Sequence, residues 1–377
     1  MSIKLSVIIV NYNVRYYVEQ CINSVERATA DIDSEIFVVD NASQDGSVEY
    51  LRKHFGNRIR LIESNHNLGF ARANNMAIKQ SKGLYVLLLN PDTFVGEESI
   101  RSVLKFMDEH PNAGAAGVMM HNSDGTIARE SRRGLPTPLV SLLKMCGFSR
   151  RYYLSHLPWD KPGKIEVISG AFFMTRRKVL DEVGLLDKDF FMYGEDIDLS
   201  YRIMKGGYEN WYVPAHILHY KGESTQKSSF GYVHIFYQAM LIFFRKHYGH
   251  LSFLITIPIK LAIYMRAILA LVQMIPDRLR KLLGMEHQED SLPLYCFVGS
   301  GAMLRECRKL SQRKALDAAF CRKLNEVGQC NVLVYDVDSS FKYEDVLKYA
   351  RKYKGKFQIG TYSRKSRVLL TSSEVIL

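Results

Sequence analysis

The stretch Leu5-Ser6-Val7-Ile8-Ile9-Val10 decides the fold. It is a nearly continuous run of apolar, mostly β-branched side chains, which is typical of a parallel strand buried on both faces. The apolar residues after it recur at helical spacing and fall on one helix face: Val14, Tyr17, Val18, Cys21, Ile22 and Val25. A buried strand followed by a helix that covers it predicts an α/β domain.

The same pattern recurs along the first 120 residues. Strands are predicted near 36–39, 59–62 and 85–89, and helices are predicted from Ser47, Gly69 and Ser99. Three successive βαβ units predict a Rossmann-like, mostly parallel sheet with flanking helices. A further helix is predicted from Glu195 to Lys205, where Gly206 and Gly207 end it.

Polar side chains follow each of the four predicted strands. They are Asn11 to Asn13, Asp40 to Ser43, Ser64 to Asn67, and Asn90 to Asp92. In a parallel sheet, ligands bind beyond the carboxyl ends of the strands. The alternative at any single position is a turn former or a helix cap, but four polar strand ends in succession favour a ligand site.

Composition and charge restrict the class of partner. The chain has 377 residues, and its 51 Lys and Arg against 39 Asp and Glu give a formal net charge of +12. Such a balance favours anionic partners, but the α/β part has no basic-aromatic recognition motif, so no nucleic-acid partner is expected.

The six cysteines form no CxxC pair and are expected to be reduced thiols. The N-terminus has no targeting segment, which predicts a cytoplasmic catalytic part.

Three regions are predicted: a catalytic domain over 1–245, a basic helical segment over 246–290 and a small module over 291–377. From 245 to 281 the chain carries seven basic residues and one acid. Its apolar runs, 251–258 and 261–275, contain no uncharged run of about 18 residues that would predict a transmembrane helix. An amphipathic helix on an anionic membrane surface is therefore expected. The alternative is a helix packed against another protein or a second copy.

The module over 291–377 has predicted strands near 294–298 and 332–335. Gly299-Ser300-Gly301 follows the first of these strands, but Leu304 stands where a dinucleotide fingerprint needs its third glycine. Cofactor binding is therefore not expected. The run from Asn331 through Asp336 to Tyr349, followed by Thr361 to Ser373, faintly resembles the Rossmann-like region that accompanies some polysaccharide sugar transferases. A role in contacting a protein partner or in self-association is expected.

Five ordered motifs resemble those of the family 2 glycosyltransferases of GT-A fold, particularly the rhamnosyltransferase-like branch of cell-surface polysaccharide assembly. The resemblance spans roughly residues 4–245. The motifs are Ser6-Val7-Ile8-Ile9-Val10-Asn11-Tyr12-Asn13, Val39-Asp40-Asn41-Ala42-Ser43-Gln44-Asp45-Gly46-Ser47, Asn67-Leu68-Gly69-Phe70-Ala71, Leu89-Asn90-Pro91-Asp92 and Gly194-Glu195-Asp196-Ile197-Asp198-Leu199.

The resemblance implies a divalent cation, Mn²⁺ or Mg²⁺, at the donor diphosphate. Asp92 is the implied ligand, and Asn90 stands where many relatives have a first aspartate. The same resemblance implies that His219 is a second ligand of this cation. Its imidazole suits Mn²⁺ better than Mg²⁺.

For the nucleotide sugar, the resemblance implies that Asp40 accepts from the imide N–H of a pyrimidine, which predicts a dTDP- or UDP-sugar donor. The alternative is that Asp40 caps its own turn. The other residues implied to bind the donor are Asn11, Asn13, Asn41, Ser43, Asn67 and Gly69.

For the acceptor, Asp196 is the expected base that takes the hydroxyl proton during inversion, and Glu195 is the second candidate. Asp198 is expected to bind Arg202 four residues on. Gly170 and Ala171 are implied near the acceptor. Trp159 is a candidate sugar platform or a core residue.

The expected function is that of an inverting, metal-dependent glycosyltransferase that moves L-rhamnose or another hexose to a lipid-linked oligosaccharide or polysaccharide. We expect a peripheral location on the inner face of the cell membrane. The alternative is a non-catalytic scaffold that binds nucleotide or glycan, for which Asn90 in place of a carboxylate is the support.

Overall fold

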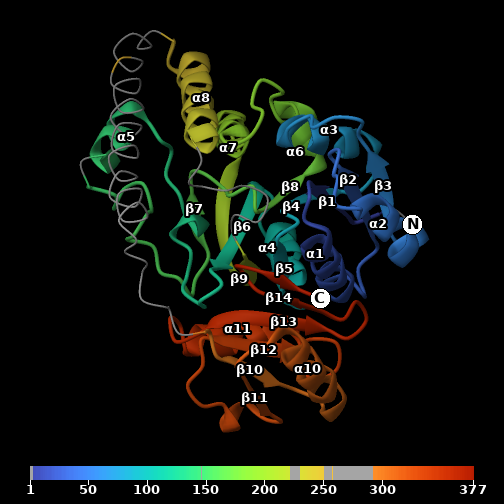
Figure 1. Ribbon diagram of the computed structural model, residues 1–377. Helices are drawn as coiled ribbons and strands as arrows, with labels where there is room; N and C mark the ends of the chain where they lie inside the picture. The colour runs from blue at the N-terminus through green and yellow to red at the C-terminus, as the bar shows by residue number, and fades with distance from the viewer. Residues whose placement is uncertain (1–2, 146, 221–229, 250–256, 258–291) are drawn as a thin grey trace, which may run out of the picture.

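A computed structural model describes residues 3–145, 147–220, 230–249, 257 and 292–377 (Figure 1). Within these residues, the first part of the chain forms a nine-stranded sheet with helices on its faces. Its strands are β1 Leu5–Asn11, β2 Ser34–Asp40, β3 Arg60–Glu63, β4 Tyr85–Leu89, β5 Thr93–Val95, β6 Ala113–His121, β7 Gly163–Ile165, β8 Phe172–Arg176 and β9 Glu209–His219. Its helices are α1 Arg15–Ala28, α2 Ser47–Phe55, α3 Phe70–Gln80, α4 Ser99–Glu109, α5 Pro138–Met145, α6 Arg177–Val183, α7 Glu195–Lys205 and α8 Phe230–His247.

The strand order is β3-β2-β1-β4-β8-β6-β9-β5, and β7 pairs with β9. The four predicted strands β3, β2, β1 and β4 are parallel neighbours. β8 then runs antiparallel between β4 and β6, while β6 and β9 are parallel. The predicted α/β class is therefore confirmed, and the antiparallel β8 is an addition that the sequence pattern did not predict.

The continuous apolar run in β1 is explained by burial on both faces of the sheet. Val7 and Ile9 pack in one hydrophobic cluster with residues of α1 and α4. Ile8 and Val10 pack in another cluster with residues of α3 and α7. Since both faces are covered, no position of the strand tolerates a polar side chain without a partner.

The region between β6 and β7 contains a helix although it has four prolines. The prolines stand at 136, 138, 158 and 162, and α5 begins at Pro138. A proline is well accommodated in the first turn of a helix, where its missing N–H has no intrahelical partner in any case.

A second, six-stranded sheet follows at the end of the described chain, with the order β11-β10-β12-β13-β14-β15. Its elements are β10 Tyr295–Val298, α10 Gly301–Lys314, β11 Ala318–Cys321, β12 Val332–Asp336, α11 Tyr343–Lys352, β13 Gln358–Ser363, β14 Val368–Leu370 and β15 Val375–Ile376. The strands β11, β10, β12 and β13 are parallel, so the predicted small α/β module is confirmed. The boundaries at 245 and 290 stay predictions.

The C-terminal sheet is docked directly onto the larger one (Figure 1). Phe94, Leu218 and Tyr220 share a buried cluster with Leu333 and Tyr335 of β12. At its edge the Gln20 amide donates to Thr361 Oγ1 at 2.6 Å, and the Tyr220 hydroxyl donates to Gln20 Oε1 at 2.9 Å. The C-terminal module therefore packs against the end of β9 and holds it in place.

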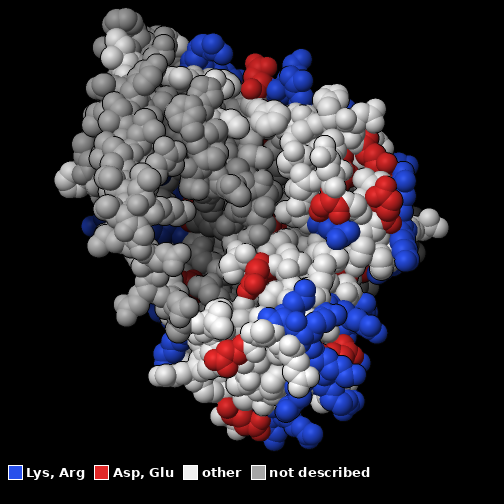
Figure 2. All heavy atoms as spheres, viewed as in Figure 1, with Lys and Arg blue, Asp and Glu red and all other residues white. Residues whose placement is uncertain are grey.

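Lys and Arg side chains gather on the α10 side of this module (Figure 2). α10 alone carries Arg305, Arg308, Lys309, Arg313 and Lys314.

None of the helices in the described ranges is both long and apolar enough to cross a membrane. The segment 251–275, for which a membrane-surface helix is predicted, lies outside the described residues except for residue 257.

Candidate active site

A cluster of three polar side chains lies at the carboxyl end of β4 and of β9. His219 Nε2 is 3.3 Å from Asp92 Oδ1 and 3.3 Å from Asn90 Nδ2. Pairing of Thr93 with His219 between β5 and β9 brings these distant residues together, and Tyr220 N donates to the Asp92 carbonyl at 3.0 Å. We call Asn90, Asp92 and His219 the metal corner, after the cation that the sequence motifs predict at Asp92 and His219.

Asp40 lies at the end of β2 and is 1 % exposed. Its Oδ2 accepts from Asn11 Nδ2 at 2.8 Å, and its Oδ1 accepts from Ser43 N at 2.9 Å. Ser43 Oγ in turn accepts from Asn11 Nδ2 at 3.1 Å and from Asn13 N at 3.0 Å. The structure thus brings these four predicted residues together, with the Asp40 carboxylate engaged by the turn that follows β2.

Asn41 and Asn67 form the next part of the rim. Asn41 Nδ2 donates to Asn67 Oδ1 at 2.8 Å, and Gly69 N donates to the same oxygen at 3.0 Å. Gly69 has φ +79°, and an added Cβ would lie 2.4 Å from the Phe191 carbonyl oxygen. The glycine is therefore required both by its backbone conformation and by the close approach of a neighbouring loop.

Asp196 lies at the start of α7, and both of its carboxylate oxygens are engaged. Its Oδ2 forms an ion pair with the Arg133 guanidinium and accepts from Gly170 N at 3.1 Å. Oδ1 accepts from Ile197 N at 2.8 Å. Because Arg133 is largely buried, desolvation opposes its charge, but the Asp196 carboxylate and the Tyr152 hydroxyl outweigh this effect and raise the pKa of Arg133.

The loop at 169–171 connects the two acidic parts of the site. Gly170 bonds to Asp196, and the Ala171 carbonyl accepts from Asn90 N at 3.2 Å. The predicted acceptor-side residues therefore lie between the predicted base and the metal corner.

Glu195 is the other carboxyl group at this helix start, and it differs from Asp196. It is 6 % exposed, and its Oε2 has no hydrogen-bond partner within the described part of the chain. Burial, reinforced by the negative charge of Asp196, raises the pKa of Glu195 to about 8. At neutral pH Glu195 is therefore mostly protonated and is a poor proton acceptor.

This raised pKa predicts a pH-dependent stability. An unfolded chain releases the Glu195 proton near its ordinary pKa of 4.5, whereas the folded chain retains it up to about pH 8. The stabilisation is fully present below pH 4.5 and is lost as the pH rises through 8, by at most about 1.4 kcal/mol per pH unit. Urea unfolding between pH 5 and 8 should show a smaller pH slope for Glu195→Gln than for the parent chain. Equal slopes would contradict the prediction.

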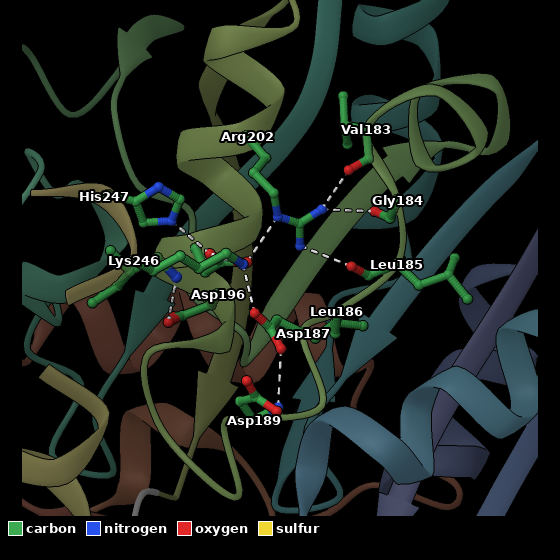
Figure 3. Close-up of polar contacts among 12 residues, drawn as sticks. Val183, Gly184, Leu185, Leu186, Asp187, Asp189, Asp196, Arg202, Lys246 and His247 are labelled. Carbon is green, nitrogen blue, oxygen red and sulfur yellow. Dashed lines mark hydrogen bonds and ion pairs between the residues drawn. The ribbon is translucent and has the colours of Figure 1, made fainter. Parts of the chain in front are cut away.

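Asp198 has a structural environment, two residues further along α7. It is fully buried and accepts from Arg202 Nε at 2.8 Å, as expected, and also from Lys246 Nζ at 2.8 Å and His247 Nε2 at 2.7 Å. Burial raises the pKa of Asp198, but the charges of Lys246 and Arg202 and the hydrogen bonds from all three residues outweigh it and lower this pKa. Arg202 also donates to the carbonyls of Val183, Gly184 and Leu185 (Figure 3). The network fixes α7 to α8 and to residues 183–185, which precede α7 in the chain.

Two residues of this site carried no sequence signal. Arg133 stands in the region between β6 and β7 where periodicity fades, 63 positions from Asp196. Phe191 contacts Gly69 through its backbone, which no side-chain pattern encodes.

Trp159 is partly buried in a core cluster, with the Arg132 guanidinium 3.4 Å from its ring centroid.

The family profile described as Glycosyl transferase family 2 matches residues 6–184. The chain is 28 % identical over 263 residues to the N-acetylglucosaminyl-diphospho-decaprenol L-rhamnosyltransferase of Mycobacterium tuberculosis, covering 64 % of this chain and 84 % of that protein. It is 30 % identical over 204 residues to the low-salt glycan biosynthesis hexosyltransferase Agl10 of Haloferax volcanii, covering 52 % and 61 %. Among solved structures, the mannosyltransferase PcManGT of Pyrobaculum calidifontis with GDP-Man and Mn²⁺ is similar at a TM-score of 0.46 and 19 % identity, covering 65 % of this chain and 64 % of that one.

Proposed function

We propose, from the premise that residues 6–184 belong to glycosyl transferase family 2, that this chain is an inverting glycosyltransferase. It would move one sugar from a dTDP- or UDP-sugar to a hydroxyl group of a lipid-linked glycan. The M. tuberculosis relative, named for L-rhamnose transfer to a lipid-linked N-acetylglucosamine, supports rhamnose or another hexose as the sugar.

The observation that carries this proposal is the placement of two acidic groups on either side of the 169–171 loop. Asp92 lies in the metal corner, and Asp196 lies beyond Gly170. Transfer from a nucleotide sugar needs one group at the leaving diphosphate and a base at the acceptor hydroxyl. A scaffold that only bound nucleotide would not need Arg133 to orient Asp196, which favours the enzyme.

The metal corner fits a divalent cation in its donor chemistry. No group of three His, Cys, Asp or Glu side chains in the described ranges is arranged around a common ion position. Asp92 and His219 offer two ligands, and the Asn90 amide oxygen offers a third after rotation of the amide, which is a suitable mixed set for Mn²⁺. A cation held there would neutralise the charge that develops on the leaving diphosphate.

Asp196 is the proposed base because of how its carboxylate is held. Arg133 and Gly170 both engage Oδ2, which fixes the carboxylate orientation and leaves lone-pair capacity on Oδ1 for the acceptor hydroxyl. Oδ1 would take the hydroxyl proton as the oxygen attacks the anomeric carbon from the face opposite the diphosphate. Glu195, protonated at neutral pH, is the weaker candidate.

The remaining site residues are proposed to bind the nucleoside end of the donor. Asp40 has both oxygens engaged by Asn11 and Ser43, but each carboxylate oxygen has two lone pairs and retains capacity for the pyrimidine imide. Asn13, Asn41, Asn67 and Gly69 would line the same side. A lipid-linked acceptor would place the enzyme at the cytoplasmic face of the membrane, with the 246–290 segment in contact with anionic lipid and the C-terminal module available to a protein partner.

The test is a screen of nucleotide sugars against the purified chain with Mn²⁺. dTDP-L-rhamnose and UDP-hexoses should release nucleoside diphosphate, faster when a polyprenyl-diphosphate-linked N-acetylglucosamine is added, and EDTA should abolish the release. Nucleotide binding without any release, with every donor and this acceptor present, would favour the scaffold instead.

A further inference from the structure

A cavity lined by arginine and aromatic side chains lies in the region between β6 and β7, and none of its lining residues belongs to the metal corner. Its volume is about 540 Å³, and three arginines and three aromatic residues contribute most of its lining: Arg129, Arg132, Arg150, Phe148, Tyr153 and Trp159. We call it the arginine pocket. Neither the donor site nor the proposed base uses these side chains.

Arg132 is the unusual member of the arginine pocket because it is 2 % exposed. Its guanidinium lies over the Trp159 ring and donates to the Leu157 carbonyl, but its Nε has no hydrogen-bond acceptor within the described residues. Burial lowers the pKa of Arg132, and its electrostatic interaction with the Tyr212 hydroxyl group opposes this effect without outweighing it. A buried cation of this kind is unfavourable unless an anion accompanies it.

The other two arginines add positive charge, and Glu130 is a carboxylate whose charge also reaches the lining residue Tyr153. Arg129 and Arg150 are exposed, and across the described ranges no ion pair joins Arg129, Arg132 or Arg150 to a carboxylate. Three guanidinium groups around one cavity form a favourable environment for a phosphate or diphosphate, which each can bind through two N–H donors.

The lining of the arginine pocket also includes an exposed apolar side chain. Phe148 lines the pocket and is 69 % exposed. Large apolar side chains at this exposure mark contact surfaces when they adjoin a binding site. The arrangement fits a ligand that carries an anionic group next to a hydrocarbon chain.

The arginine pocket is also connected to the proposed base through the backbone. Arg132 is extended, with φ −136° and ψ 112°, and the next residue, Arg133, binds Asp196. Successive side chains of an extended segment point to opposite sides. One short segment therefore presents one arginine to the base and the other to the pocket.

We propose that the arginine pocket binds the diphosphate of a polyprenyl-linked acceptor, with the first isoprene units against Phe148. This inference rests on the proposed function for the identity of the acceptor, and it names the anionic group by which that acceptor is held. The pocket would distinguish a diphosphate-linked glycan from the same glycan without phosphate.

Calorimetric titration of farnesyl diphosphate onto the whole chain tests the pocket independently of turnover. EDTA should be present, so that cation-dependent binding at the metal corner is suppressed. Farnesyl diphosphate should bind at least ten-fold more tightly than farnesol. The double variant Arg129→Gln/Arg150→Gln should weaken it by at least ten-fold, whereas Arg313→Gln/Arg322→Gln, which removes two exposed arginines elsewhere, should not. Arg132→Gln should weaken it further, and the exposed double variant remains informative if Arg132→Gln fails to fold.

The outcomes separate this inference from the proposed function. Equal binding of farnesyl diphosphate by the Arg129/Arg150 double variant and the parent chain would overturn the pocket, even if nucleotide sugars are turned over. Arginine-dependent binding to phosphatidylglycerol vesicles, with no preference for farnesyl diphosphate over farnesol, would overturn the assignment to an acceptor in favour of lipid headgroups. Failure of the nucleotide-sugar screen alone would leave the diphosphate measurement intact and would overturn the transferase.

Discussion

Replacing Asp196 by asparagine is expected to lower kcat by about 10²–10⁴-fold, the range for removal of a general base. The amide keeps the size of the carboxylate and can still accept from Gly170 N, but it cannot take a proton from the acceptor. Because the proposed donor site lies on the other side of the 169–171 loop, calorimetric binding of the nucleotide should be nearly unchanged.

Glu195→Gln is the matched control for this experiment, since the two carboxyl groups are neighbours in sequence. Glu195 is mostly protonated at neutral pH because burial raises its pKa to about 8, so its amide analogue should keep most of the activity at pH 7. If Glu195→Gln loses turnover and Asp196→Asn does not, the roles of the two residues are reversed.

Replacing Asp92 by asparagine is expected to lower kcat/KM by about 10²–10³-fold, a loss typical of removing one group that stabilises developing charge. The side chain is 2 % exposed, and an isosteric amide preserves its packing. What disappears is the one negative charge of the metal corner, which otherwise attracts a cation to the donor diphosphate. Mn²⁺ should then no longer strengthen binding of the nucleoside diphosphate.

Comparison of a nucleoside with its diphosphate isolates this effect. Calorimetry with uridine and UDP, or with thymidine and dTDP, should show that Asp92→Asn weakens only the diphosphate. A matched acidic control is Asp31→Asn, whose carboxylate pairs with Arg101 on the surface and should leave both affinities unchanged. Full Mn²⁺ dependence in Asp92→Asn would remove Asp92 from the metal corner.

Local sequence patterns predicted the elements that carry the site. The helix from Glu195 to Lys205 was predicted with the bounds that the structure has, because an acidic first turn and two terminal glycines define its ends. The parallel strands β1 to β4 were predicted because burial on both faces leaves an uninterrupted apolar signal. A parallel arrangement of these four strands also predicts that the polar residues at their carboxyl ends are neighbours. The structure has this arrangement.

Contacts between distant segments could not be predicted in this way. Nothing in the periodicity of 172–176 indicates that β8 lies antiparallel between β4 and β6. Likewise, Arg133 meets Asp196 only after the chain has crossed the sheet, and residues so far apart leave no local pattern. The partners of the site residues therefore required the three-dimensional structure, whereas the motif residues did not.

The docked C-terminal sheet sets an order of events during synthesis. Phe94, Leu218 and Tyr220 are buried against β12, which leaves the ribosome more than a hundred residues after them. At about 5–20 residues per second, the catalytic part waits several seconds with this apolar face uncovered. A nascent chain arrested before residue 332 would expose that face to chaperones and proteases, so the cluster at the end of β9 is covered only after the chain has been translated through β12.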